Sequence, residues 1–367
     1  MIKSLIKKIL QIFGYKIIRQ SIKGNIYYVE ESDNLKSVSP EIVNSIFKFF
    51  AKVPPFYSNN ITKELRISGA WRQDLELRRK KQIKYLLEKD LKSYSHLLDN
   101  MLRNELVYGL WDIEYYSDKI IGKEVPDKVI KNIEIFSLVT GLDIKILDDG
   151  NFGNKWGIKI DNKIITYSDT FKGVSAYNIA NYLNAKNKKK LTYIDLGSGI
   201  GSDVIKVEKL IKSPTRILLI DIPLNLTTAF AYVSMNTGKK CVLIESEEDL
   251  EFYLKKDFTD NEFLFIPSIF VEKIPKTLDE IDLMFNSGSF SEMDYDTIKF
   301  YMDNLMRNGP VQALFEINSN KSFINTSEHN ELLSNSFPIP ENFKLIKRNN
   351  SIDSEDRYIE NLYVKNI

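Results

Sequence analysis

The stretch Leu191–Asp203, LTYIDLGSGIGSD, decides the fold class of this chain. Its first six residues, 191–196, are mostly apolar and predict a short buried strand. Three glycines at alternate positions follow within residues 197–201, and a helix is expected from Ser202. Glycines permit unusual backbone dihedral angles and let a ligand approach the main chain closely. The stretch therefore predicts a ligand site where a strand turns into a helix.

The carboxylates near this loop indicate what kind of ligand it binds. A dinucleotide fingerprint needs a glycine where Ser202 stands, and Asp195 would repel a pyrophosphate. Asp195 suits a cationic ligand instead. Asp221, about 20 residues further on, can accept both hydroxyls of a ribose. The pattern D-x-G-x-G-x-G with a distal acid resembles that of S-adenosylmethionine (SAM)-dependent methyltransferases. A glycine-rich turn in another kind of α/β domain is the alternative.

The composition is that of an ordinary globular protein. The 367 residues are 43% hydrophobic and 28% charged, enough for one large or two modest domains. The 51 basic and 50 acidic residues leave a formal charge of +1, which gives no electrostatic footprint for nucleic acid. A single cysteine excludes an intrachain disulfide and a thiolate zinc cluster, and we expect no metal site. No apolar run of roughly 18 residues predicts a membrane span. We expect a cytoplasmic protein.

The first 20 residues carry an amphipathic pattern. Apolar side chains at helical spacing oppose Lys3, Lys7 and Lys8, which predicts a basic helix within residues 1–22. Such a helix packs on its own domain or on a partner subunit, or lies on the anionic inner face of a membrane. It is not expected to be a secretory signal, because lysines interrupt its apolar run.

Residues 23–190 are expected to form a mainly helical acceptor or accessory domain. Helical spacing recurs in 71–106, 125–140 and 175–183, and a β-hairpin is predicted around Asp161-Asn162. The polar run 184–190, NAKNKKK, is the predicted domain boundary.

Residues 191–367 alternate between strand and helix patterns. This alternation predicts a doubly wound, mostly parallel sheet that binds SAM. After the first strand, further strands are expected at 216–220, 241–244, 263–266, 281–285 and 311–316. Two late runs, 343–347 and 359–364, predict an antiparallel hairpin at the edge of the sheet.

In open α/β sheets, ligands bind outside the carboxyl ends of the strands. This rule selects the residues that follow each predicted strand. The predicted cofactor-binding residues are Asp195, Gly197, Ser198, Gly199, Gly201, Asp221, Ile222, Pro223, Pro267, Ser268, Asn286 and Ser287.

Two further motifs bring a family resemblance. Asp221-x-Pro223 and the stretch Asn286–Met293, NSGSFSEM, resemble the D-x-P and N-x-x-S-F-x-E-M motifs of sugar O-methyltransferases from bacterial polysaccharide gene clusters. The similarity runs from about Trp71 to the C-terminus. It implies a class I methyltransferase fold and methyl transfer to a sugar hydroxyl of a surface-glycan precursor. The segment 315–322, FEINSNKS, departs from it, since no basic or aromatic residue stands directly after the predicted strand, which ends at Glu316.

Methyl transfer to a hydroxyl requires a base that removes its proton. Glu292 is the predicted base, with Asn286 and Ser289 orienting the acceptor or the methionine end of SAM. His329 is the rival base, and it can equally be an exposed loop residue. First-turn acids such as Glu292 can also simply complement a helix dipole.

Other functions stay open. A divalent-metal variant would use carboxylates such as Asp294, Asp296 and Glu316, although their spacing does not demand one. The acceptor can instead be lipid-linked or a small amine. The chain can also be a non-catalytic nucleotide-binding scaffold in glycan assembly. A dehydrogenase is disfavoured by Ser202.

Overall fold

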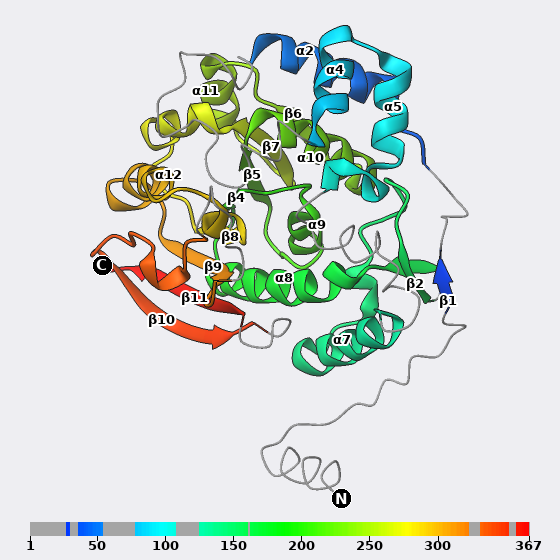
Figure 1. Cartoon of the computed structure of the whole chain (residues 1–367). Coiled ribbons are helices and arrows are strands. Elements are labelled where there is room, and N and C mark those ends of the chain that lie inside the picture. The colour runs from blue at the N-terminus through cyan, green and yellow to red at the C-terminus, as the bar shows by residue number, and fades with distance from the viewer. Residues whose placement is uncertain are drawn as a thin grey trace, which may run out of the picture.

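An eight-stranded sheet forms the centre of the computed structural model (Figure 1). The structure describes residues 27–29, 36–53, 78–107, 125–160, 162–322, 331–351 and 357–366. The predicted N-terminal helix, Trp71 and His329 lie outside these ranges.

The first strand of this sheet along the chain is a central one, and later strands are added on both of its sides. Its strand order is β10-β11-β9-β8-β4-β5-β7-β6. All neighbours from β9 to β6 are parallel, whereas β11 pairs antiparallel with both β9 and β10. The strands are β4 (Leu191–Leu196), β5 (Thr215–Asp221), β6 (Lys240–Leu243), β7 (Glu262–Pro267), β8 (Leu283–Ser287), β9 (Ala313–Ser319), β10 (Phe343–Asn350) and β11 (Tyr358–Lys365). This confirms the predicted doubly wound, mostly parallel sheet of class I methyltransferase-like order, with its antiparallel edge hairpin.

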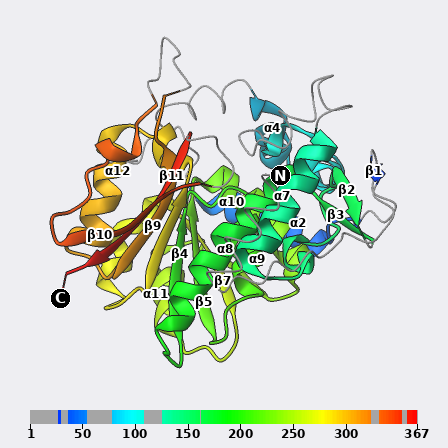
Figure 2. The ribbon, with the colours of Figure 1, turned by 90° about the horizontal axis from the view of Figure 1, so that it is seen from below.

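Helices cover both faces of the sheet (Figure 2). Along β4, Tyr193 belongs to one apolar cluster while Ile194 and Leu196 belong to the other. Because both faces are buried, the parallel strands are nearly continuous apolar runs. One face packs against α8 (Tyr167–Ala185), α9 (Ser202–Glu208) and α10 (Pro223–Thr237). The other packs against α11 (Glu247–Lys255), the 3-10 segment Ser268–Lys276, α12 (Tyr295–Tyr301) and its π-helical continuation Met302–Arg307.

The first half of the chain packs on the same sheet. Its helices α2, α4 and α5 share one hydrophobic cluster with α10 and the strands, and Phe49, Leu98 and Ala229 all belong to it. Helix α7 forms a smaller core with a three-stranded sheet and the start of α8. The elements are β1 (Tyr27–Val29), α2 (Pro40–Lys52), α4 (Lys80–Glu88), α5 (Leu91–Asp99), α7 (Val125–Thr140), β2 (Gly157–Ile160), β3 (Lys163–Ile165) and the 3-10 turns Met101–Arg103, Glu105–Val107 and Ile144–Leu147.

Two helices differ from the sequence prediction. The helical pattern of 71–106 breaks where Lys89 takes a left-handed φ of 51° and Asp90 accepts a hydrogen bond from the Ser93 N–H. Helix α8 begins at Tyr167 rather than 175, because Thr166 and Asp169 form a capping box there. The predicted hairpin around Asn162 is confirmed. No helix within the described ranges is long and apolar enough to cross a membrane.

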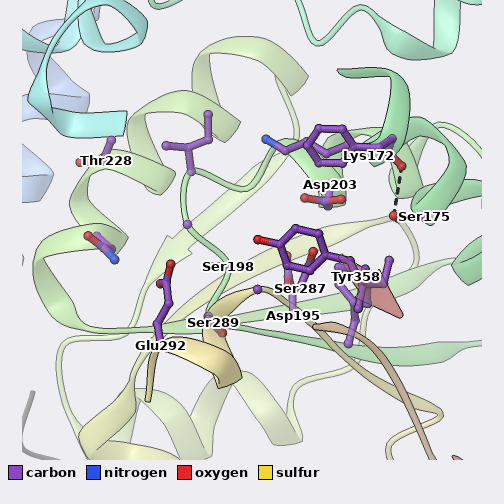
Figure 3. Close-up of a pocket in the computed structure, with 18 of the residues that line it drawn as sticks. Lys172, Ser175, Asp195, Ser198, Asp203, Thr228, Ser287, Ser289, Glu292 and Tyr358 are labelled. Atoms are coloured by element: carbon purple, nitrogen blue, oxygen red, sulfur yellow. Dashed lines mark hydrogen bonds between the residues drawn. The ribbon is translucent and has the colours of Figure 1, made fainter. Parts of the chain in front are cut away.

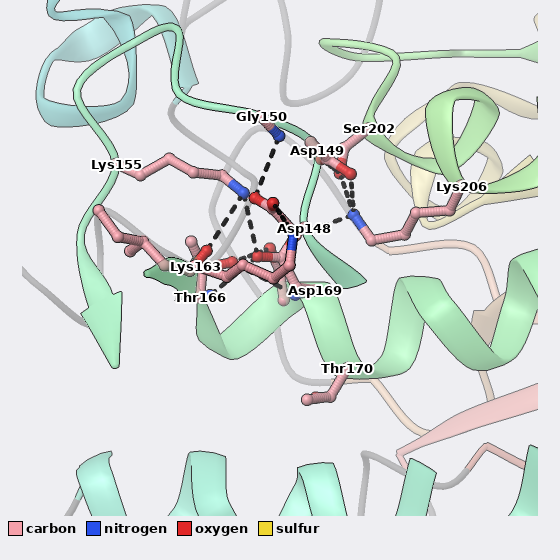
Figure 4. Close-up of polar contacts among 12 residues, drawn as sticks. Asp148, Asp149, Gly150, Lys155, Lys163, Thr166, Asp169, Thr170, Ser202 and Lys206 are labelled. Atoms are coloured by element: carbon pink, nitrogen blue, oxygen red, sulfur yellow. Dashed lines mark hydrogen bonds and ion pairs between the residues drawn. The ribbon is translucent and has the colours of Figure 1, made fainter. Parts of the chain in front are cut away.

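A buried ion cluster joins the two halves of the chain (Figure 4). Lys206 of α9 is 0% exposed, and its Nζ lies 2.5 Å from Asp149 Oδ1 and 2.8 Å from Asp169 Oδ1. Lys155 lies 3.4 Å from the other oxygen of Asp169. Ser202 donates to Asp149 as well, at 2.5 Å. The cluster therefore ties α8 and the segment before β2 to the helix that follows the glycine loop.

The cluster keeps the Asp169 carboxylate ionised although it is buried. Burial opposes the charge of Asp169, but Lys155 and Lys206 lower the pKa of its carboxyl below the ordinary range. Burial likewise opposes the charge of Lys206, but Asp149 and Asp169 raise the pKa of its ammonium. Each charge is thus stabilised only by its partners.

We expect Lys206→Met to lower the free energy of unfolding by about 3–5 kcal/mol at neutral pH, because it leaves Asp149 and Asp169 short of a buried counter-charge. A lowered carboxyl pKa gives stability that is present above the unfolded-state value of about 4 and is lost as the pH falls through the lowered value, so the deficit of the variant should shrink below about pH 4. Urea denaturation at neutral and at acidic pH measures the loss of unfolding free energy and its dependence on pH. Lys239→Met, which removes a surface pair with Asp260, is the control and should change less than about 1 kcal/mol. Equal losses in the two variants would contradict a buried ionic role.

Candidate active site

The glycine loop after β4 has a conformation that side chains would prevent. Gly197 and Gly201 have φ values of 73° and 78°. A Cβ atom on Gly197 would lie 2.1 Å from Ser289 Oγ, and one on Gly201 would lie 2.7 Å from Val233 Cγ2. The loop therefore fits between the turn that follows β8 and helix α10 only because these residues are glycines.

A cavity opens beside this loop, at the carboxyl ends of β4 and β8 (Figure 3). This is where the sheet reverses its winding, because β5 and β8 pair with opposite sides of β4. Polar side chains from several elements line the cavity: Arg79, Lys172, Ser175, Asp195, Ser198, Asp203, Asn225, Thr228, Ser287, Ser289, Glu292, Ser351 and Tyr358. Gly197 and Gly199 contribute backbone to its wall.

Two carboxyls of the cavity wall carry an unfavourable charge. Asp195 is 3% exposed, and burial, together with Asp203 and Asp221, raises its pKa well above the ordinary value. Burial also raises the pKa of Asp203, against the opposing charges of Lys172 and Lys206. Neither carboxyl accepts a hydrogen bond from another side chain of the described residues. The wall is therefore complementary to a ligand that brings a positive charge.

Asp221 fixes the backbone of the glycine loop by hydrogen bonds. Its carboxylate accepts hydrogen bonds from the Gly199 N–H at 2.9 Å, the Ile222 N–H at 2.7 Å and Asn225 Nδ2 at 3.1 Å. Burial raises its pKa to about 6 in spite of these donors. Asp221 is not among the cavity-lining residues. Its predicted contact with a ribose stays a prediction, and its observed contacts fix the loop backbone.

The other predicted cofactor residues divide into two groups. Ser198 and Ser287 line the cavity together with Asp195 and the loop. Ile222 and Pro223 begin α10, and Pro267 and Ser268 are buried where β7 ends, two strands from β4. None of these four lines the cavity, and a role for them in cofactor binding stays a prediction.

The predicted catalytic residues separate in a similar way. Ser289 and Glu292 line the cavity from the 3-10 turn Ser289–Glu292. Asn286 is fully buried behind the wall, where its amide donates to Leu196 O at 2.8 Å and accepts from Asn318 Nδ2 at 3.0 Å. These contacts position the glycine loop and the turn, and the predicted contact of Asn286 with the acceptor or the cofactor stays a prediction.

Neither the rival base nor a metal gains support from the structure. His329 lies outside the described residues. Within the described ranges, no group of three or more His, Cys, Asp or Glu side chains is arranged to hold a metal. The Glu316 carboxylate is fully buried and accepts hydrogen bonds from Asn318, Ser334 and Asn361.

Several residues that line the cavity were not predicted from the sequence. Lys172 lies in the first turns of α8, ahead of the predicted start of that helix. Asp203 stands two residues after the loop, at the end of the opening stretch, and was not among the predicted site residues. Arg79, Thr228 and Tyr358 come from distant elements, and no local pattern marks them.

Comparisons with known proteins assign no family to the chain. No family model and no curated protein matches it. Solved structures align over about half of it. TrmN from Thermus thermophilus is 12% identical over 58% of this chain and 56% of that chain, with a TM-score of 0.32. Magnesium protoporphyrin IX methyltransferase (ChlM) from Synechocystis PCC 6803, with bound S-adenosylhomocysteine (SAH), is 12% identical over 54% of this chain and 84% of that chain, with a TM-score of 0.34. Similarity at this level assigns no function to the chain.

We expect Asp195→Asn to raise the free energy of unfolding of the ligand-free protein at about pH 8 and to raise it less at about pH 5. A raised carboxyl pKa stabilises the fold fully only below the unfolded-state value, and this stability is lost as the pH rises through the raised value. The neutral amide avoids that loss. Urea denaturation at the two pH values measures it, with the exposed Asp279→Asn as control. A variant less stable than wild type at about pH 8 would contradict this account of the wall.

Proposed function

We propose that this chain is a SAM-dependent methyltransferase. The observation that carries the proposal is the pair of buried or partly buried carboxyls, Asp195 and Asp203, which line a cavity beside the glycine loop and accept no hydrogen bond from another side chain of the described residues. The pKa values of both carboxyls are raised in the absence of a ligand, so a cationic ligand would stabilise their charged forms. SAM carries an ammonium and a sulfonium. The buried Ser198 Oγ in the same wall, which has no hydrogen-bond partner among the residues that the structure describes, also fits a ligand with polar groups.

The proposed acceptor is a sugar hydroxyl of a surface-glycan precursor. Support comes from the resemblance of Asn286–Met293 to the sugar O-methyltransferase motif and from the position of Glu292 in the cavity wall. Figure 3 shows the Glu292 carboxylate on the side of the loop away from Lys172. The donor and the acceptor base would then occupy different parts of one cavity, as an in-line displacement requires.

In the proposed reaction, bound SAM supplies an electrophilic methyl group. Asp195 and Asp203 hold the ammonium of the donor, and the bare backbone at Gly197 and Gly199 lets it lie close to the loop. Glu292 takes the proton of the acceptor hydroxyl as that oxygen attacks, and Ser289 lies beside it to orient the acceptor. Asn286 acts only by fixing the loop and the turn.

Two related proposals differ in the acceptor and in catalysis. A lipid-linked acceptor would bring the enzyme to the inner face of the membrane through residues 1–20, and a free sugar precursor would be methylated in the cytoplasm. A nucleic-acid acceptor has no support in the nearly balanced charge of the chain. A non-catalytic scaffold would bind the ligand without turnover, so binding and turnover must be measured separately.

Isothermal titration calorimetry with SAH tests donor binding. We expect one SAH site per chain, and Asp195→Ala should weaken it at least tenfold, because it removes a charge-assisted contact of about 1.5–3 kcal/mol. Asp279→Ala, on the surface, should bind as wild type does. An unmodified chain that binds no SAH would exclude the methyltransferase.

Transfer of a labelled methyl group from SAM to a panel of nucleotide sugars and glycan precursors tests the acceptor and the base. We expect Glu292→Gln to reduce turnover by roughly 10²–10⁴-fold with SAH binding unchanged, because only proton removal is lost. The exposed Glu341→Gln is the matched control. Full turnover in Glu292→Gln would eliminate this residue as the base, and SAH binding without turnover on any acceptor would favour the scaffold.

A further inference from the structure

Lys172 differs from the other buried lysines that the structure describes. It is 7% exposed, lines the cavity and has its ammonium in the cavity wall (Figure 3). Lys155 and Lys206 are buried too, but both pair with the carboxylates of the ion cluster. Lys172 makes no hydrogen bond or ion pair with any described residue. A buried ammonium with no hydrogen-bonded counter-charge among the described residues is costly, which points to an anionic group on the ligand.

The surroundings of Lys172 carry the opposite charge. Its ammonium opposes the burial-driven rise of the pKa of Asp203 and, more weakly, that of Asp195. Figure 3 shows Lys172 beside Asp203, with Asp195 further down the same wall. One end of the cavity therefore presents one cationic and two anionic groups at short range. A ligand group of matching chemistry carries both an ammonium and a carboxylate.

We propose that Lys172 binds the carboxylate of the amino-acid end of SAM, while Asp195 and Asp203 bind its ammonium. The inference rests on the proposed function and deepens it. An α-amino acid carries its ammonium and its carboxylate on the same carbon atom. Only neighbouring anionic and cationic groups of the protein can therefore bind the ammonium and the carboxylate at once. The adenosine end of the donor then lies away from α8, along the rest of the cavity.

The fold holds Lys172 and Asp203 at a fixed separation. Asp169 precedes Lys172 by three residues on α8, and Lys206 follows Asp203 by three residues on α9. Residues three apart on a helix lie on one face, so the Asp169–Lys206 pair, 2.8 Å long, lies about one turn from the proposed site. The ion cluster thus pre-organises both helices for the ligand.

Calorimetry on the full chain with two ligands tests this role. SAH carries the amino-acid end, and 5′-methylthioadenosine lacks it. We expect Lys172→Met to weaken SAH binding roughly 10- to 100-fold, the equivalent of about 1.5–3 kcal/mol for a charge-assisted contact, and to leave 5′-methylthioadenosine binding within about twofold. Lys172→Arg should recover most of the SAH affinity. Lys239→Met is the surface control, and thermal unfolding checks that each variant is folded.

The outcomes separate the inference from the proposed function. Weakened SAH binding with unchanged 5′-methylthioadenosine binding supports the role of Lys172. Unchanged SAH binding by Lys172→Met, or an equal loss for both ligands in a folded variant, overturns it while the methyltransferase proposal stands. A wild-type chain that binds neither ligand overturns both.

Discussion

The site depends on one buried lysine. Lys206 has no exposed surface and pairs with Asp149 and Asp169, which come from the segment before β2 and from α8. Removing Lys206 would leave two buried carboxylates short of counter-charge, so the ion pairs favour one packing of the three segments. Such a cluster adds little net stability compared with apolar packing, but it demands one arrangement. That arrangement sets α8 against the helix that leaves the glycine loop, and so fixes the wall of the cavity.

A second polar network holds the opposite side of the cavity. Glu316 accepts hydrogen bonds from Asn361 of the edge hairpin and from Asn318, and Asn318 continues to Asn286. Asn286 then donates to Leu196 O, the carbonyl just before the glycine loop. The chain of hydrogen bonds runs through β11, β9, β8 and β4. It explains why these buried amides and a carboxylate occur in the sheet: each one is hydrogen-bonded to another member of the network or to backbone, and together they fix the ends of the strands that face the ligand.

Local sequence patterns predicted the sheet well because its physical causes are local. Apolar runs separated by turns place each strand, and the glycine loop needs its glycines for steric reasons that any sequence with this turn shares. The site was predicted in part. Asp195, Ser198 and Glu292 lie at the carboxyl end of a strand or in the segment that follows it, and all three line the cavity. Asp221 and Asn286 obey the same rule but bind backbone instead, since the direction of a side chain depends on tertiary contacts. Lys172 and Arg79 reach the cavity from the first half of the chain, and only the packing of that half against the sheet brings them there.

The central claim is that one end of the cavity binds the amino-acid end of the donor. A crystal structure of the full chain with SAH tests it most directly. The account predicts that the SAH carboxylate lies within hydrogen-bond distance of Lys172 Nζ and its ammonium within that distance of Asp195 or Asp203, about 3 Å in each case. SAH bound in the reverse orientation, or outside the cavity beside the glycine loop, would contradict the account.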